Sequence, residues 1–274
     1  MTLPTPLSNA DYRTVSEFLE NQAAIRLGEG KEYLVTSRLG RLVREFELKD
    51  FAALCEALRQ GRDRRLMAAV VDAMTTNETF WFRDPAHYGA LTQEVLGKHA
   101  STSARIWSAA ASTGQEVYSI AISLRDAMRS RVLPGNFRYE ILGTDISPTA
   151  LSQARSARYC GVSASRGLSD EQRRRYFRAE GDCIEVLPEY RTGVTLREFN
   201  LMSSFGALGR FDVIFCRNVL IYFSQERKRD IIERFAHALN PGGTLLLGST
   251  ESMNDHGDLF EMQSINGGLV YRKR

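Results

Sequence analysis

The feature that most constrains the fold is a change of pattern at about residue 104. Beyond it, short apolar runs alternate with amphipathic segments of helical periodicity. The expected strands are RIWSAA, YEILGTD, FDVIFC and TLLLGS, and the expected helices are QEVYSIAISLRDAM, SPTALSQARSA and QERKRDIIERFAHAL. This order predicts a mostly parallel sheet with helices on both faces. Near the end, Asn266 to Gly268 separate FEMQSI from LVYRKR, which predicts a hairpin and an antiparallel last strand.

The preceding part of the chain, from residue 8 to residue 75, shows only helical patterns. Ser8 or Asn9 can cap a first helix, and Asp50 can cap another whose apolar residues share one face. KEYLVTSRLGRLVREF lies between them, and RRLMAAVVDAM follows Gly61 as a further helix. These signals predict a small helical bundle.

The two patterns divide the chain into domains. We expect a helical domain over residues 1–76, a linker over residues 77–100 and an α/β domain over residues 101–274. Residues 158–199 interrupt the β–α alternation with the charged segment SDEQRRRYF and the strand-like runs CIEVL and VTLREF. They predict a small antiparallel subdomain inserted in the larger domain.

Composition limits the classes of function. The formal charge is +3 over 274 residues, and acidic and basic residues are interspersed. This argues against a broad nucleic-acid-binding surface. No 18 apolar residues run together, and the first residues do not resemble a secretion signal. We therefore expect a cytoplasmic protein that neither binds nucleic acid nor inserts into a membrane.

The cysteines show no spacing that predicts a metal or disulfide site. Cys55, Cys160, Cys183 and Cys216 include no CxxC pair, and the four histidines have no ligand spacing. We expect no metal site and no disulfide framework. Each cysteine is interpreted as a reduced thiol that packs as a small hydrophobic residue.

The turn after the first strand of the α/β domain, in IWSAAASTGQEVYSIA, has one glycine where a dinucleotide-binding turn has three. Small residues from Ala109 to Gly114 let a ligand approach the backbone at a helix N-terminus. Glu116 would repel a pyrophosphate but attract an ammonium group. Asp145 ends the next strand, where an acid commonly binds ribose hydroxyls. S-adenosylmethionine (SAM) satisfies both acids, although Glu116 could also be a solvated helix-start acid and Asp145 a strand-end cap.

Four segments then resemble the signature segments of a known family. They are TTNETFWFRD, WSAAASTGQEVYSIA, ILGTDIS and FCRNVLIYF. They are similar, in this order, to segments of the bacterial chemotaxis receptor glutamate O-methyltransferases, the CheR family. The resemblance implies an all-α N-terminal domain and a Rossmann-like class I SAM-dependent methyltransferase domain. It also implies methyl transfer to glutamates on the cytoplasmic helices of chemoreceptors, with S-adenosylhomocysteine (SAH) as the second product.

The resemblance implies individual site residues as well. Arg83 matches an arginine near the methionyl carboxylate of SAM, a group that a guanidinium can bind through two hydrogen bonds. Tyr222 matches a tyrosine near the methyl group, and these two are the candidate catalytic residues. The candidate cofactor-binding residues are Asn77, Thr79, Arg83, Glu116, Asp145, Asn200, Leu201, Arg217 and Asn218. Without the resemblance, Tyr222 could be a half-buried core residue and Asn200 a strand end.

A basic helix is the candidate substrate-binding surface. Its residues, with one that precedes them, are Lys31, Arg38, Arg41 and Arg44. Receptor methylation segments are acidic helices, so opposite charge would favour encounter with a receptor-reading N-terminal domain. The alternative interpretation is a solvated face. Some members of the family bind a C-terminal receptor pentapeptide through the inserted subdomain, but the short connection PEYRTG argues against that tether here.

Three other functions share some of these features. A SAM-dependent methyltransferase of RNA or of a small molecule would share the C-terminal segments, although an RNA enzyme usually has a broader basic surface. Five retained residues argue against a non-catalytic SAM-sensing module: Arg83, Glu116, Asp145, Asn218 and Tyr222. The missing glycines and Glu116 disfavour a dinucleotide dehydrogenase.

Overall fold

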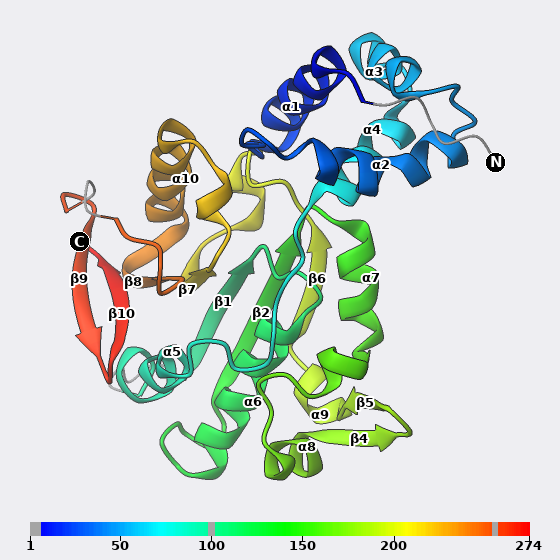
Figure 1. Cartoon of the computed structure of the whole chain (residues 1–274). Helices are drawn as coiled ribbons and strands as arrows, with labels where there is room; N and C mark the ends of the chain where they lie inside the picture. Colours follow the sequence, from blue (N-terminus) through cyan, green and yellow to red (C-terminus); the bar gives the residue numbers. More distant parts are fainter. Residues whose placement is uncertain (1–6, 98–101, 254–256) are drawn as a thin grey trace. The chain divides into compact units, whose positions relative to one another are not determined.

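A computed structural model describes residues 7–97, 102–253 and 257–274 (Figure 1). The chain divides into two compact units, and each is described by itself. The helical unit comprises Met1–Thr76 and Tyr222–Lys228, and the α/β unit comprises Asn77–Ile221 and Arg229–Arg274. Among the helices within the described ranges, none has the length and hydropathy that a membrane span requires.

The N-terminal segment of the helical unit folds as its capping signals predict. Its helices are α1 (Asn9–Ala23), α2 (Glu32–Glu45), α3 (Phe51–Gln60) and α4 (Arg64–Met74). Ser8 and Asp11 form a reciprocal capping box at the start of α1. Asp50 accepts a hydrogen bond from the backbone of Ala53 at the start of α3, and Gly61 ends that helix in the left-handed conformation. The predicted helices are therefore confirmed.

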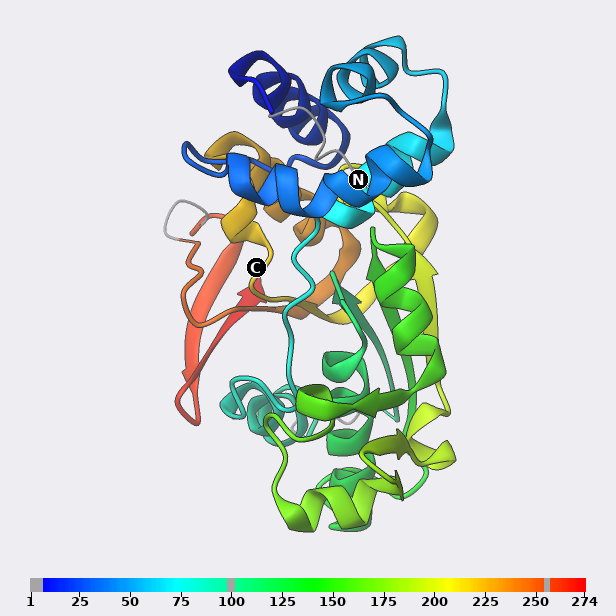
Figure 2. The ribbon, with the colours of Figure 1, turned by 45° about the vertical axis from the view of Figure 1, so that its right-hand side comes forward.

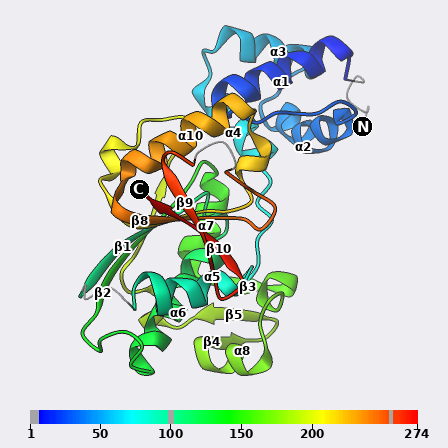
Figure 3. The same ribbon diagram turned by 90° about the vertical axis from the view of Figure 1, so that its left-hand side faces the viewer.

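The α/β unit is built on a seven-stranded sheet with the order β6-β2-β1-β7-β8-β10-β9. The strands are β1 (Ser103–Ala109), β2 (Arg138–Asp145), β6 (Val194–Glu198), β7 (Phe211–Cys216), β8 (Leu239–Leu247), β9 (Phe260–Ile265) and β10 (Gly268–Lys273). Neighbours from β6 to β8 are parallel, whereas β10 is antiparallel to both β8 and β9. This confirms the predicted mixed sheet, whose β9–β10 edge faces the viewer in Figure 3. The strand order reverses between β1 and β7, and open α/β sheets bind ligands beyond the carboxyl ends of the strands at such a point.

Helices and aromatic side chains cover the two faces of this sheet. The helices are α5 (Ala86–Gly89), the π-helix Ala90–Val95, α6 (Gln115–Arg129), α7 (Pro148–Ser156), which lies beside β6 (Figure 2), and α10 (Gln225–Ala238). Side chains alternate along β1, so Ile106 shares a core with α6. Trp107 faces the opposite side and packs against Phe205 and Phe235.

The inserted subdomain is smaller than predicted. Its antiparallel sheet has the order β3-β5-β4. Its elements are β3 (Arg158–Cys160), α8 (Asp170–Tyr176), β4 (Phe177–Glu180), β5 (Cys183–Val186) and α9 (Pro188–Arg191). The run VTLREF was expected in the antiparallel excursion, and this is wrong, because it forms β6 and pairs in parallel with β2. Parallel neighbours need a long crossover connection, and the subdomain lies within the connection from β2 to β6.

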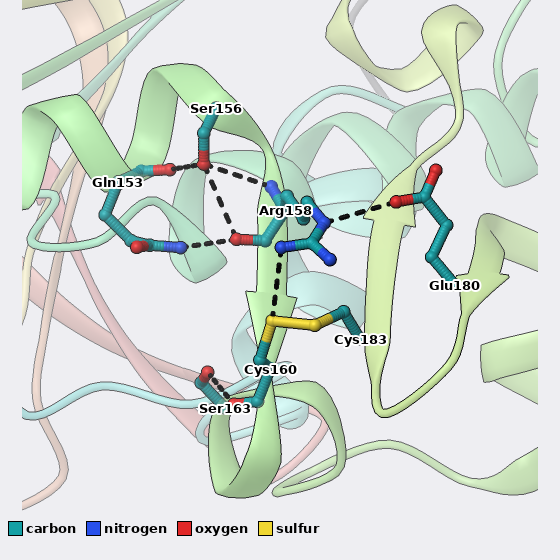
Figure 4. The surroundings of a disulfide bond; sticks show 7 residues. All are labelled: Gln153, Ser156, Arg158, Cys160, Ser163, Glu180 and Cys183. Atoms are coloured by element: carbon teal, nitrogen blue, oxygen red, sulfur yellow. Dashed lines mark hydrogen bonds and ion pairs between the residues drawn. A yellow bond between two sulfur atoms is a disulfide. The ribbon is translucent and has the colours of Figure 1, made fainter.

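Two cysteines form a disulfide, so the expectation of four reduced thiols is wrong. The register of β3 and β5 places Cys160 opposite Cys183, with their Cα atoms 4.0 Å apart (Figure 4). Their separation of 23 residues has no local signal, because only the antiparallel pairing brings them together. Cys55 and Cys216 are free and buried, as expected of small hydrophobic residues.

Candidate active site

The turn from β1 into α6 lies at the carboxyl end of the central strand. Ala110 and Ser112 have left-handed φ values of 59° and 51°, and Gly114 has a φ of 94°. A Cβ added to Gly114 would lie 2.8 Å from the Cβ of Ala154 in α7. The single glycine of the turn is therefore required by both its backbone conformation and its close packing.

Asp145 links the turn after β1 to the turn after β2. Its buried carboxylate accepts hydrogen bonds from the backbone N–H of Ser112 at 2.7 Å and of Ser147 at 2.9 Å. Its backbone carbonyl accepts from the N–H of Phe199, just beyond β6, at 2.9 Å. The carboxylate thus caps the strand end. That role is compatible with ribose binding, because an ionised carboxylate has about four lone-pair sites.

The segment that precedes α5 is fixed against these two turns. The backbone carbonyl of Asn77 accepts from the Ser112 hydroxyl at 2.9 Å, and its side-chain amide donates to the Ser147 hydroxyl at 3.3 Å. Trp81 is fully buried in the core of the inserted subdomain, where its ring packs edge-on against Tyr159. The turns and the subdomain therefore share one connecting segment.

A buried arginine organises the centre of the site. The side chain of Arg217 is 1% exposed and pairs with Glu116 at 3.0 Å and with Asp84 at 2.7 Å. It also donates to the backbone carbonyl of Arg83. The second Glu116 oxygen accepts from the Ser108 hydroxyl at 2.8 Å. Asp84 and Ser108 are not among the residues predicted from the sequence. Asp84 follows Arg83 in a segment that resembles the family. No spacing along the chain predicts its pairing with Arg217, which is 133 residues away.

The pKa values of the two acids respond differently to this arginine. Burial raises the pKa of Glu116, and the charge of Arg217 offsets only part of that effect. Burial acts in the same direction on Asp84, but hydrogen bonding and charge from Arg217 prevail and lower its pKa. An additional cation beside Glu116 would favour its ionised form. The site therefore suits a ligand that carries an ammonium group.

Arg83 and Thr79 are both half-buried in the segment that leads to this cluster. The guanidinium carbon of Arg83 lies 5.4 Å from the ring centroid of Phe80. Its charge also contributes to the lowered pKa of Asp84. Arg83 is thus the half-buried arginine of the segment beside the cluster, whereas Arg217 is buried inside the cluster.

The remaining cofactor candidates lie after β6 and β7. Asn200 is half-buried, and its side-chain oxygen accepts from the backbone N–H of Met202 at 2.9 Å. Leu201 is buried. Asn218 has a left-handed φ of 58° directly after Arg217. All three follow carboxyl ends of strands in the α/β unit.

Tyr222 belongs to the helical unit and is therefore described apart from this cluster. It ends a 3-10 turn (Leu220–Tyr222), it is half-buried, and its backbone carbonyl accepts from the N–H of Arg26 at 3.1 Å. This bond lies within the helical unit.

The four basic substrate candidates also lie in the helical unit, in or beside α2. Lys31, Arg41 and Arg44 are exposed, and Arg41 forms a surface pair with Glu45 at 2.8 Å. Arg38 is half-buried and donates to the carbonyls of Met74 and Thr75 at 3.0 and 2.9 Å. Arg38 therefore binds the C-terminal end of α4, which is a structural role.

A cavity of about 420 Å³ lies away from the acids, at the amino end of β7. Arg210 and Arg234 line it together with His237. Both arginines donate to backbone carbonyls, Arg210 to those of His237 and Leu239 and Arg234 to that of Leu201. Arg234 also pairs with Asp230 at 2.6 Å. Because the cavity lies at the amino end of β7 and not at the carboxyl ends of the strands, it is not a candidate active site.

The mixed sheet, the small-residue turn and the two acids define a Rossmann-like methyltransferase domain with SAM as its cofactor. Comparison with known families agrees and is more specific. The family model described as the CheR methyltransferase SAM binding domain matches residues 77–268, and that of the CheR methyltransferase all-alpha domain matches residues 10–75. The chain belongs to the CheR methyltransferase family.

Known relatives align over nearly the whole chain. The chemotaxis protein methyltransferase of Vibrio parahaemolyticus is 44% identical, with 97% of this chain and 98% of that protein covered. Chemotaxis protein methyltransferase 1 of Pseudomonas aeruginosa is 40% identical, over 97% of this chain and 99% of its own length. The Escherichia coli chemotaxis protein methyltransferase is 35% identical, over 99% and 93%. This chain is a SAM-dependent methyltransferase similar to these chemotaxis enzymes.

Proposed function

We propose that this enzyme transfers the methyl group of SAM to glutamate side chains of chemoreceptors, through the acid–arginine cluster at the carboxyl ends of the strands. The observation that carries the proposal is Glu116, which is half-buried beside a turn of small residues and ion-paired with the buried Arg217. In this proposal Glu116 binds the methionine ammonium group, Arg83 the methionine carboxylate and Asp145 the ribose. Asn200 and Leu201 lie on the adenine side, and Asn77, Thr79, Arg217 and Asn218 complete the site.

The sulfonium of SAM activates its own methyl group for transfer. A glutamate side chain has an ordinary pKa of about 4.3, so it is already ionised at neutral pH and needs no general base. The residues of the site would hold a carboxylate oxygen in line with the methyl group and exclude water. Orientation of this kind lowers a barrier by up to about 7 to 11 kcal/mol. Tyr222, near the methyl group, would contribute to this positioning.

The proposed partner is the acidic helical region of a receptor in the cytoplasm. Lys31, Arg41 and Arg44 provide exposed positive charge for such a helix, while Arg38 acts by supporting α4. Opposite charges speed encounter and become less effective at high salt. Tethering by a receptor pentapeptide is not part of the proposal, because only the short helix α9 separates β5 from β6.

One experiment tests this function. The protein is incubated with methyl-labelled SAM and receptor-containing membranes, and label is expected in receptor protein in an alkali-labile form. Methyl esters hydrolyse in base, whereas N-methyl groups and most RNA methyl groups do not. Label that appears in added RNA, or that resists base, would favour the alternative substrates. Binding of SAM without any transfer would favour a sensing module.

A further inference from the structure

A buried acid outside the sites described so far joins two loops at the carboxyl edge of the sheet. Glu251 is 7% exposed. Its Oε2 accepts hydrogen bonds from the backbone N–H of Asn218 at 2.7 Å and of Gly248 at 2.8 Å. Asn218 follows β7 and Gly248 follows β8, and the two strands are parallel neighbours. One carboxylate oxygen therefore links the loops beyond these strands.

The packing around Gly248 is correspondingly close. A Cβ added at this glycine would lie 2.6 Å from Nδ2 of Asn218 and 2.8 Å from Oε2 of Glu251. Real Cβ atoms do not approach other atoms so closely, so the side chains of Asn218 and Glu251 would have to move. The amide of Asn218 and the carboxylate of Glu251 thus occupy the space that any side chain at position 248 would need.

Asn218 itself is held in an uncommon conformation. Its φ of 58° is left-handed, which asparagine tolerates better than most residues but which still needs support from its surroundings. A short hydrogen bond from its N–H to a carboxylate provides that support. Within the described ranges, no protein donor meets the buried side-chain oxygen of Asn218. Buried acceptors are normally satisfied, so an acceptor without a protein donor is unusual at this position.

We propose that Glu251 is a positioning residue, which holds the backbone of Asn218 so that its side-chain amide faces SAM. The inference rests on the proposed role of Asn218 in cofactor binding. A carboxylate is a costly choice for packing alone, because its desolvation must be offset by hydrogen bonds. Here the bonds go to the two backbone groups whose position sets the loop. Glu251 acts on the cofactor through Asn218 and does not touch the reacting atoms.

Calorimetric titration of the full-length protein with SAH tests the proposal. Glu251→Ala and Asn218→Gly are each expected to weaken binding by about tenfold or more, since one charge-assisted hydrogen bond is of that order. The double variant should bind within about twofold of Asn218→Gly, because residues that act through one another are non-additive. Glu251→Gln, whose amide oxygen still accepts from N–H groups, should restore binding to within about threefold of wild type. Glu261→Ala, at an exposed position of β9, is the matched control and should bind SAH as wild type does.

The outcomes distinguish failure of the cofactor-binding role of Asn218 from failure of the positioning role of Glu251. Wild-type binding by Asn218→Gly would show that this residue is not in the cofactor site, and the role of Glu251 would fall with it. Weak binding by Asn218→Gly together with full binding by Glu251→Ala, or with fully additive effects, would overturn only the role of Glu251. Glu251→Gln that binds as weakly as Glu251→Ala would also overturn it. Should Glu251→Ala not fold, Gly248→Ala decides: its Cβ must displace both side chains, and wild-type affinity in this variant would overturn the proposal.

Discussion

At the scale of single residues, the behaviour of this site depends on one buried cation. Arg217 is surrounded by Glu116, Asp84 and the ring of Tyr88, whose centroid lies 5.9 Å from its guanidinium carbon. These neighbours raise its pKa against the effect of burial. A buried arginine with two acids keeps one of them, Glu116, oriented before any ligand arrives.

Glu116→Gln tests this arrangement. The substitution removes the charge that would bind an ammonium group, so SAH binding should weaken by about tenfold or more. It also removes a charge whose pKa burial raises and leaves Arg217 paired with Asp84, so the free energy of unfolding should fall by no more than about 1 kcal/mol. Calorimetry and urea unfolding measure the two effects. The control Glu140→Gln breaks a partly exposed pair with Arg105 and should change stability by less than about 1 kcal/mol. Unchanged SAH affinity in Glu116→Gln would contradict the assigned role.

Tyr222→Phe tests the second candidate catalytic residue. If its hydroxyl helps to position the reacting groups, the initial rate of methyl transfer should fall several-fold but not vanish. SAH affinity should stay at the wild-type value, because the variant keeps the ring. Full activity in initial-rate assays would count against any role for the hydroxyl.

His87 makes stability depend on pH. Burial, with the nearby charge of Arg217, lowers its pKa to about 4 from 6.5. Below pH 6.5 the unfolded chain takes up a proton that the folded chain does not, so stability is lost as pH falls from 6.5 towards 4. The loss is at most about 3 kcal/mol.

Urea unfolding at about pH 7 and about pH 4.5 measures this dependence. The drop in unfolding free energy should be smaller in His87→Gln than in wild type, because that variant cannot take up the proton. His237→Gln, at an exposed position, should keep the wild-type drop. Equal drops in wild type and His87→Gln would refute the assignment.

At the scale of elements, the connection from β1 through the turn into α6 sets the site. The turn is held by its own left-handed residues, by Asp145 and by Asn77, so three segments far apart in the sequence meet there. The loops after β7 and β8 meet in the same way at Glu251. The carboxyl edge of the sheet is therefore cross-linked by side chain to backbone bonds, which keeps candidate ligand groups in place.

Gly114→Ala is expected to destabilise this element. The variant needs a left-handed φ at an alanine and places a Cβ 2.8 Å from Ala154. A loss of about 2 to 4 kcal/mol of unfolding free energy follows from strain and overpacking. Gly135→Ala is the matched control, because a Cβ there meets nothing within 4 Å. Equal stability of the two variants in urea unfolding would contradict the close packing at Gly114.

At the scale of the whole molecule, methyl transfer and receptor choice are proposed to lie in different units. The cofactor candidates are in the α/β unit, whereas the exposed basic residues and the catalytic candidate Tyr222 are in the helical unit. Variants on the basic face of α2 should therefore affect receptor methylation without affecting cofactor affinity.

Arg41→Glu tests this separation. The charge reversal should slow receptor methylation several-fold and weaken its salt dependence, because opposite charges no longer attract. SAH affinity should equal that of wild type. Arg138→Glu changes an exposed charge of the α/β unit and serves as the control. Receptor methylation and salt dependence unchanged by Arg41→Glu would refute the basic face as a receptor-binding surface.

Much of the fold could be predicted because its signals are local. Caps such as Ser8 and Asp50, the β–α alternation and the Asn266–Gly267 turn act over a few residues, and the helices and the mixed sheet followed from them. The run VTLREF was assigned to the wrong sheet, because the alternation of apolar and polar residues along a strand does not indicate its partner strand. The cofactor was also predicted, from the turn of small residues before Glu116 and from Asp145 at the end of a predicted strand, while the roles of these two acids stay predictions.

The features that could not be predicted depend on pairs of residues that are distant along the chain. The Cys160–Cys183 disulfide needs the register of β3 and β5, and the pairing of Arg217 with Asp84 needs two segments to fold onto one edge of the sheet. Glu251 has no motif at all, because its role depends on two backbone N–H groups. Most of the elements, the family and the cofactor thus follow from the sequence alone, because local periodicity and four family-like segments are present before the chain folds. Folding decided which side chains fix the site, because burial and hydrogen bonding between distant residues exist only once the sheet is assembled.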